Sequence, residues 1–213
     1  CRKPGMISFA GGMPDPAIFP VEQFTEAASI LRTEGRDILQ YGATEGYAPL
    51  KDFLASWCAP RLGRKVAPDE MLITSGSIQG ADLMTLATVN PGEYVITEAP
   101  TFLGVTTDMY NHGAKFLCVP CDEEGMLVDR LPALIEGARG EGKTVKFIYT
   151  IATFQNPCGA TMSLERRKAL VRVAREYGVA IFEDDPYGYV RFDGEHLPTL
   201  FSLDGGEHVI YAG

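Results

Sequence analysis

The sequence predicts a three-layer α/β/α sandwich, in which helices cover both faces of a mostly parallel sheet. Two observations carry this prediction. Short apolar segments recur from about residue 70 onward, and their unbroken apolar character is typical of strands buried on both faces. Segments with helical spacing separate several of them, and such alternation favours a parallel sheet. The six predicted strands are 71–74, 94–97, 115–119, 145–150, 179–182 and 208–212.

Apolar residues recur at helical intervals in four other segments, which we predict to be helices. These segments are roughly 21–34, 49–62, 78–89 and 163–177. In sheets of this kind the ligand binds beyond the carboxyl ends of the strands. Functional residues are therefore expected directly after the predicted strands.

The composition bounds the class of protein. The chain has 213 residues, of which 46% are apolar and 22% charged, with a formal net charge of −9. Such an acidic surface disfavours nucleic acid or anionic lipid as a partner of this segment. No apolar run approaches the length of a membrane span, and the first residues lack the apolar core of a signal peptide. We therefore predict a cytoplasmic protein.

The cysteines are scattered and odd in number, and we predict reduced thiols. They are Cys1, Cys58, Cys118, Cys121 and Cys158. The spacing of Cys118 and Cys121 is of a metal-binding type, but no second pair accompanies them and the histidines lie far away in sequence. A strand end that turns at Pro120 explains the pair more simply. We predict no metal site.

The first cluster with chemical meaning is Ser75-Gly76-Ser77, which joins the predicted strand 71–74 to the predicted helix 78–89. Small residues at a helix N-terminus let backbone N–H groups and a hydroxyl face an anion. Capping of the helix by the same residues explains the cluster equally well. The glycine pattern of a dinucleotide site and the GK[ST] ending of a nucleotide-phosphate loop are both absent.

Two more clusters follow later strands. Asn156-Pro157-Cys158-Gly159 comes after the strand 145–150, and a structural turn is the more ordinary explanation for such residues. The run Glu183-Asp184-Asp185-Pro186-Tyr187 follows the strand 179–182. A carboxylate held at a partly desolvated sheet edge needs a cation as its partner. A protonated heterocycle would serve.

In this order and at these spacings, the clusters resemble the pattern of the class I/II aminotransferases, which are pyridoxal-phosphate (PLP) enzymes of fold type I. The opening FAGGMPDPAIFP (9–20) and the segment LQYGATEGYAPLK (39–51) match as well. The similarity covers nearly the whole chain. It is greatest to 2-aminoadipate and kynurenine aminotransferases and to the aminotransferase-like domains of certain fused regulators. It implies the large domain of the PLP-transferase type I fold, in incomplete form.

The resemblance implies a role in cofactor binding for several residues. Ser75, Gly76 and Ser77, with the backbone at Ile78, would hold the PLP phosphate at a helix N-terminus. Phe102, in the sequence EAPTF, would stack on the pyridine ring.

Three further residues match the family at the ring itself. Asn156 and Tyr187 would hydrogen-bond the phenolic oxygen of the cofactor, and Asn156 would also contact the substrate. Asp184 matches the carboxylate that faces the pyridine nitrogen, where a negative charge favours the protonated ring. Asp184 and Tyr187 are thus the candidate catalytic residues, while Asp185 has a secondary part.

The N-terminal residues carry a second set of implied roles. Gly12 lies in the segment that folds over the substrate carboxylate in the family. Tyr41 matches a tyrosine that reaches the cofactor phosphate of the neighbouring subunit, although it could also anchor a glycine-rich loop. The resemblance implies a homodimer. It also divides the chain into an N-terminal, substrate-covering arm (1–48) and a PLP-binding large domain (49–213).

The nucleophile of the family is a lysine that forms a Schiff base with PLP. It normally follows a strand like HVIYAG (208–213) by a few residues, and no lysine of this sequence stands in that setting. We therefore expect a segment of a longer protein, cut before that lysine and before the small domain, and inactive by itself.

The expected activity of the longer protein is transamination, in which an amino group moves from an amino acid to a 2-oxo acid. A PLP-dependent lyase would use the same residues and stays an alternative. A third possibility is the aminotransferase-like sensor domain of a transcription regulator. A helix-turn-helix segment before Cys1 would favour that reading.

Overall fold

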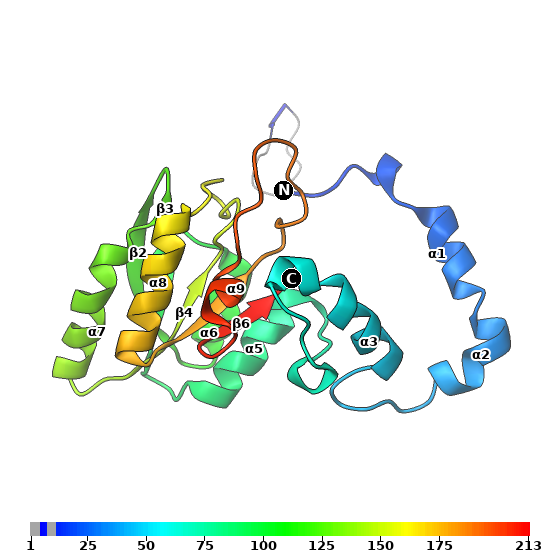
Figure 1. The fold of residues 1–213 in the computed structure, drawn as a ribbon, viewed down its shortest axis with the longest axis horizontal. Helices are drawn as coiled ribbons and strands as arrows, with labels where there is room; N and C mark the ends of the chain where they lie inside the picture. The colour runs from blue at the N-terminus through cyan, green and yellow to red at the C-terminus, as the bar shows by residue number, and fades with distance from the viewer. Residues whose placement is uncertain (1–4, 8–11) are drawn as a thin grey trace. The chain divides into compact units, whose positions relative to one another are not determined.

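The computed structural model describes residues 5–7 and 12–213 and divides into two compact units, Cys1–Ala43 and Thr44–Gly213 (Figure 1). The described residues of the first unit are almost all exposed. They form the 3-10 helix η1 (Pro16–Ile18) and the α-helices α1 (Val21–Ala28) and α2 (Leu31–Ile38). The predicted arm of residues 1–48 stays a prediction, and its residues 1–4 and 8–11 lie outside the described part.

The second unit contains the remaining elements. Its α-helices are α3 (Ala48–Trp57), α4 (Ala59–Leu62), α5 (Gly76–Thr88), α6 (Leu103–Asn111), α7 (Leu131–Gly140), α8 (Leu164–Tyr177) and α9 (Leu200–Asp204). Its strands are β1 (Tyr94–Ala99), β2 (Lys115–Asp122), β3 (Gly125–Met126), β4 (Val145–Thr150), β5 (Ala180–Asp184) and β6 (Val209–Ala212), and two 3-10 helices are η2 (Pro68–Glu70) and η3 (Val128–Arg130).

Two predicted helices are each divided in two. In the segment 21–34, the amides of Ser29 and Ile30 donate three residues back, to Glu26 and Ala27, and this tighter turn separates α1 from α2. In the segment 49–62, Pro60 lies in the first turn of α4. Because proline has no N–H to donate, α3 ends before it and a new helix begins.

The sheet has the strand order β3-β2-β1-β4-β5-β6. Every neighbouring pair is parallel except β2 and β3, which are antiparallel. The mostly parallel sheet and five of its predicted strands are confirmed. The strand predicted at 71–74 is wrong. That segment forms no ladder in the described structure, and its one backbone bond to another segment runs from the amide of Ile73 to the carbonyl of Glu45.

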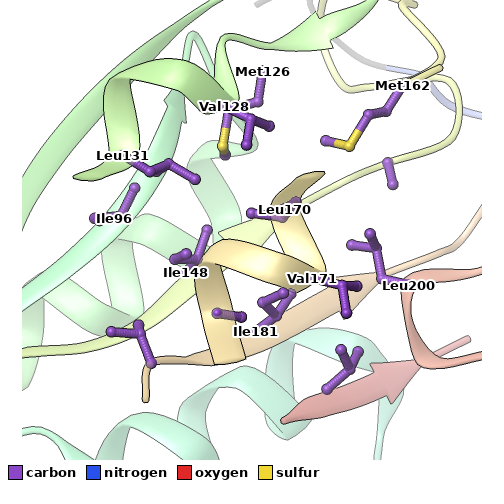
Figure 2. Packing of buried hydrophobic residues seen from close by; sticks show 14 of the residues in the cluster. Ile96, Met126, Val128, Leu131, Ile148, Met162, Leu170, Val171, Ile181 and Leu200 are labelled. Atoms are coloured by element: carbon purple, nitrogen blue, oxygen red, sulfur yellow. The ribbon is translucent and has the colours of Figure 1, made fainter. Parts of the chain in front are cut away.

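Side chains on alternate positions of the strands enter two separate cores. Ile148 of β4 packs in one cluster with α7, α8 and α9, whereas its neighbours Phe147 and Tyr149 pack in the other cluster with α5 and α6. Figure 2 shows Ile148 and Ile181 of the sheet close to Leu170 of α8. Helices thus cover both faces, and the three-layer α/β/α architecture is confirmed. None of the helices in the described residues is long and apolar enough to cross a membrane.

Helix α8 shows how local sequence sets these elements. Ser163 caps its N-terminus by accepting a hydrogen bond from the amide of Arg166, and Gly178 ends it with a left-handed φ of 61°. Its inward face includes Arg167, which is fully buried. The guanidinium of Arg167 donates to the carbonyls of Met162 and Ala152 in the loop after β4 and to the carbonyl of Pro198 in the loop after β5, so it joins two loops at the carboxyl edge of the sheet.

Candidate functional site

A cavity of about 310 Å³ opens at the carboxyl edge of the parallel strands. Its walls come from the start of α5 and from the loops that follow β1, β4 and β5. The lining residues are Ser75, Gly76, Ser77, Ile78, Phe102, Ile151, Asn156, Asp184, Pro186 and Tyr187. The structure therefore brings together all the sequence-predicted site residues of the second unit. Gly12 and Tyr41 belong to the first unit, where both are exposed.

The floor of the cavity at α5 is suited to an anion. Gly76 begins the helix with a φ of 77°, a conformation that side chains with a Cβ rarely adopt. The first amides of an α-helix have no intrahelical acceptor, and the helix dipole adds partial positive charge there. Ser77 adds a hydroxyl to this helix end. The glycine permits the sharp entry that aims these donors into the cavity.

Asp184 also lines the cavity and is buried at the end of β5, with 2% of its surface exposed. The hydroxyl of Tyr149 donates to Oδ2 of Asp184 at 2.7 Å. Atom Oδ1 is buried and has no hydrogen-bond partner among the described residues. Burial raises the pKa of this carboxyl, while the Tyr149 hydrogen bond and the nearby hydroxyl of Ser77 act in the opposite direction. An unpaired buried carboxylate oxygen calls for a cationic N–H donor.

The two acids that flank Asp184 are directed elsewhere. Glu183 is fully buried. Its carboxylate accepts hydrogen bonds from the backbone amides of Leu200 (2.8 Å) and Phe201 (3.0 Å) at the start of α9. Burial raises the pKa of Glu183 to about 7. Asp185 accepts hydrogen bonds from the Nε of Arg61 at 2.6 Å and from the hydroxyl of Tyr211 at 2.9 Å. Of the three consecutive acids, only Asp184 lines the cavity.

Arg61 does not line the cavity but supports the turn beside it, and the sequence did not reveal this role. Its side chain is only 8% exposed and forms an ion pair with Asp185, 124 positions away. A Cβ placed on Gly188 would overlap both Arg61 and Asp185, so the turn that carries Tyr187 presses directly on the ion pair. No local pattern around Arg61 signals this contact, because its partner is distant in sequence.

Phe102 and Asn156 stand on two other loops of the cavity. Phe102 immediately precedes α6, and a Cβ on Gly104 would lie 2.6 Å from its ring. The missing side chain of Gly104 therefore makes room for the aromatic ring. Asn156 is half-buried after β4 and next to the buried residue Gln155. The sequence did not single out Gln155 either.

Cys118 and Cys121 both lie on β2, where Cys118 is exposed and Cys121 half-buried. Burial raises the pKa of the Cys121 thiol to about 12. Within residues 5–7 and 12–213, no group of three His, Cys, Asp or Glu side chains gathers in a way that could hold a metal ion.

These features define an α/β protein with a helix start suited to an anion and a buried carboxylate at the carboxyl edge of its sheet. The chain belongs to the family described as aminotransferase class I and II, whose model matches residues 6–213. The resemblance inferred from the motifs is thereby confirmed. So is the fold class, since solved structures similar to this chain are aminotransferases.

Among curated proteins, the chain is 41% identical to an aromatic-amino-acid aminotransferase of Thermococcus litoralis over 98% of its own length and 50% of that protein's. Among solved structures, it matches the kynurenine aminotransferase of Pyrococcus horikoshii in complex with PMP, with a TM-score of 0.86 and 39% identity over 95% of this chain and 50% of that one.

A second solved structure is the alpha-aminoadipate aminotransferase of Thermus thermophilus, complexed with N-(5'-phosphopyridoxyl)-L-leucine. The match has a TM-score of 0.84 and 40% identity, and it covers 95% of this chain and 50% of that one. The chain thus spans about half the length of the curated relatives it matches.

Proposed function

We propose that the full-length protein containing this chain is a PLP-dependent transaminase, and that this chain supplies the cofactor-binding part. Buried Oδ1 of Asp184 is the observation that carries the proposal, because it lacks a partner among the described residues and lies in a cavity that the start of α5 also lines. A phosphorylated pyridinium ring has both complementary groups. Its phosphate suits the N-terminus of α5, and its ring N–H suits Asp184.

The residues of the cavity divide the binding of such a ring among them. Ser75, Gly76, Ser77 and the backbone at Ile78 would hold the phosphate. Phe102 would cover one face of the ring. This set fits the cofactor because one cavity offers N–H and hydroxyl donors, a carboxylate acceptor and an aromatic side chain.

The polar groups around the ring would then act as follows. Asp184 keeps the ring nitrogen protonated, and Tyr149 holds Oδ2 of Asp184 so that Oδ1 stays free for that N–H. Asn156 and Tyr187 donate to the phenolic oxygen, and Asn156 also contacts the substrate. When bound, the protonated ring withdraws electrons from the α-carbon of the substrate, which makes the α-proton easier to remove.

The substrates we propose are an amino acid and a 2-oxo acid. The relatives named above support these classes of compound and do not select one member. The N-terminal unit would contribute Gly12, over the substrate carboxylate. The cytoplasmic location predicted from the sequence stays a prediction.

We also propose that the protein is a homodimer, in which Tyr41 reaches the cofactor phosphate of the partner subunit. The side chain of Tyr41 is fully exposed. Large apolar side chains are also exposed on the second unit, including Leu86 of α5 (57%) and Leu103 of α6 (76%). Exposed apolar side chains of this kind suit an interface between subunits.

Substitution of Asp184 in the full-length protein tests the proposal. Asp184→Asn should weaken PLP binding and remove most amino-group transfer, since an amide cannot stabilise the protonated ring nitrogen. Glu165→Gln is the matched control, because that acid is 80% exposed on α8 and forms an ion pair with the neighbouring Lys168. Wild-type transfer rates in Asp184→Asn would remove Asp184 from this role.

A further inference from the structure

We infer that Glu98 and Gln155 are positioning residues, which together set the separation of Phe102 and Asn156 on the walls of the cavity. This inference rests on the proposed cofactor site. Neither residue lines the cavity itself. Their effect on a ligand is therefore indirect and acts through the two loops that do.

Glu98 is the fixed point of the arrangement. It is the penultimate residue of β1, and only 1% of its surface is exposed. Its Oε1 accepts from the hydroxyl of Thr150 at 2.6 Å, and its Oε2 accepts from the amide of Ile151 at 3.3 Å. Both donors lie at the end of β4 or just after it. The carboxylate thus joins the carboxyl ends of two adjacent strands.

Gln155 links this fixed point to both loops. Its Nε2 donates to Oε2 of Glu98 at 2.9 Å and to the carbonyl of Pro100 at 2.8 Å. Its Oε1 accepts from the amide of Cys158 at 2.9 Å. All three of these groups are held by one buried side chain, and a buried polar group that loses its partner is left desolvated without compensation. The side chain therefore has little freedom to move away.

The position of this link explains its consequence for the cavity. Pro100 lies two residues before Phe102, and Gln155 and Cys158 lie on either side of Asn156. A single amide side chain therefore joins the loop that presents the aromatic wall to the loop that presents the amide. Among the described residues, the bond from Gln155 to Pro100 is the hydrogen bond that joins these two loops to each other.

The hydrogen bond between Gln155 and Glu98 can form whether Glu98 is protonated or ionised. Burial raises the pKa of Glu98 to about 7, and the titratable groups that face it are Asp184 on β5, Tyr149 on β4 and Cys121 on β2. A proton on Oε1 can be donated to the hydroxyl of Thr150, which also accepts hydrogen bonds. Oε2 then still accepts from Gln155.

Glu98→Gln has the same shape as the protonated acid. Its amide nitrogen can face Thr150, and its oxygen can accept from Gln155 and Ile151. This variant keeps the link and is the conservative comparison. Gln155→Leu removes the link at similar volume. Gln155→Asn keeps an amide but is one methylene too short, and it serves if Gln155→Leu does not fold.

Two measurements on the full-length protein test the inference. The first is hydrogen exchange of the ligand-free protein in the peptide 156–160, which reports the amide of Cys158. The second is calorimetric binding of pyridoxine 5'-phosphate, which has the phosphate, ring nitrogen and phenolic oxygen but no aldehyde. In Gln155→Leu we expect faster exchange and roughly tenfold weaker binding, equivalent to about 1.4 kcal/mol. In Glu165→Gln, which changes an exposed acid of α8 outside the site, we expect both to stay as in wild type. In Glu98→Gln, which keeps the hydrogen bond to Gln155, we expect much smaller changes than in Gln155→Leu.

A double-mutant cycle separates positioning from general loosening. If Gln155 acts through Asn156, Gln155→Leu should weaken binding less in an Asn156→Ala background than in wild type. Full additivity of the two losses would overturn the inference. Unchanged exchange in both Gln155 variants would overturn it too, because the loop would then be held by other contacts.

The test also distinguishes this inference from the proposed function. If the wild-type protein does not bind pyridoxine 5'-phosphate, the cofactor site is wrong, and the positioning role falls with it. If the wild type binds, Asp184→Asn binds poorly and Gln155→Leu binds normally, then the cofactor site stands and only the positioning role is overturned.

Discussion

The hydroxyl of Tyr149 donates to Oδ2 of Asp184 at 2.7 Å, although the two residues are 35 positions apart in the chain. Both lie on neighbouring parallel strands, β4 and β5. The contact occupies one oxygen of the carboxylate and leaves the other, Oδ1, unpaired and buried. Tyr149 thereby selects which oxygen of Asp184 is available to a ligand.

Removal of that donor should change ligand binding and its dependence on pH. The Tyr149 hydrogen bond lowers the pKa of Asp184, so Tyr149→Phe should raise it further. Pyridoxine 5'-phosphate should bind more weakly near neutral pH, because a smaller fraction of Asp184 is then ionised and able to accept from the ring N–H. Because binding needs ionised Asp184, the loss of affinity on acidification should begin at higher pH than in wild type.

Calorimetric titrations over a series of pH values would measure this shift. The same ligand is used for both proteins, so the titration of its own phosphate cancels in the comparison. Tyr177→Phe is the control, since that hydroxyl donates to Glu136 on the surface. Coincident pH profiles for Tyr149→Phe and wild type would contradict the role given to Tyr149.

Loss of Arg61 should destabilise the fold strongly. Arg61→Met leaves the charge of Asp185 buried without its partner, and we expect the free energy of unfolding in urea to fall by about 3–5 kcal/mol. Arg61→Met combined with Asp185→Leu removes both charges and should recover much of that loss. If Arg61→Met alone were as stable as wild type, the ion pair of Arg61 and Asp185 would contribute nothing to the free energy of unfolding.

The turn after Asp185 should tolerate no side chain at Gly188. Gly188→Ala places a methyl group against the ion pair of Arg61 and Asp185, and overpacking of this kind costs about 1–3 kcal/mol. Gly137→Ala on α7 is the matched control. Nothing lies within 4 Å of its added Cβ, and alanine favours a helix over glycine by about 0.5–1 kcal/mol. The midpoint temperature of thermal unfolding should fall in Gly188→Ala and rise in Gly137→Ala.

The buried acid Glu98 should make stability depend on pH. Its ordinary pKa is 4.5, and burial raises it to about 7 in the folded protein. Between these values the folded state holds one proton more than the unfolded state, so a rise in pH favours unfolding. The contribution of Glu98 should fall by roughly 3 kcal/mol across this window.

Chemical unfolding of the ligand-free protein near the two ends of this window measures the effect. Glu98→Gln should lose less stability with rising pH than wild type, because it has no proton to release. Glu165→Gln, exposed on α8, should behave as wild type. If Glu98→Gln and wild type had the same slope, Glu98 would not titrate in this range.

The sequence predicted the residues of the cavity well, because a parallel sheet gathers the ends of its strands at one edge. Asn156 and Asp184 follow separate apolar runs, and that rule alone brings them together. The prediction of a strand at 71–74 was wrong for a related reason. Apolar character shows that a segment can be buried, but a strand also needs a neighbour for its ladder, and the described structure gives this segment none.

The contacts that support the cavity could not be predicted in this way. Arg61 and Asp185 are far apart in sequence, and an arginine on a short helix looks like an ordinary surface residue. Gln155 stands beside a recognisable motif, but its partners Glu98 and Pro100 belong to another strand and its loop. Such contacts depend on how two loops pack against each other, and the sequence of either loop alone does not predict that packing.

The run of three acids from Glu183 to Asp185 also has a consequence for insertions and deletions. The three acids have different surroundings. Glu183 accepts hydrogen bonds at the start of α9, Asp184 lines the cavity, and Asp185 forms an ion pair with Arg61. A shift of one residue in β5 would keep an equally acidic segment, yet it would turn each carboxylate toward the place of its neighbour. Changes of length near this strand should therefore be tolerated less well than conservative substitutions. Among related sequences, we therefore expect substitutions at these three positions to be more frequent than insertions or deletions next to them.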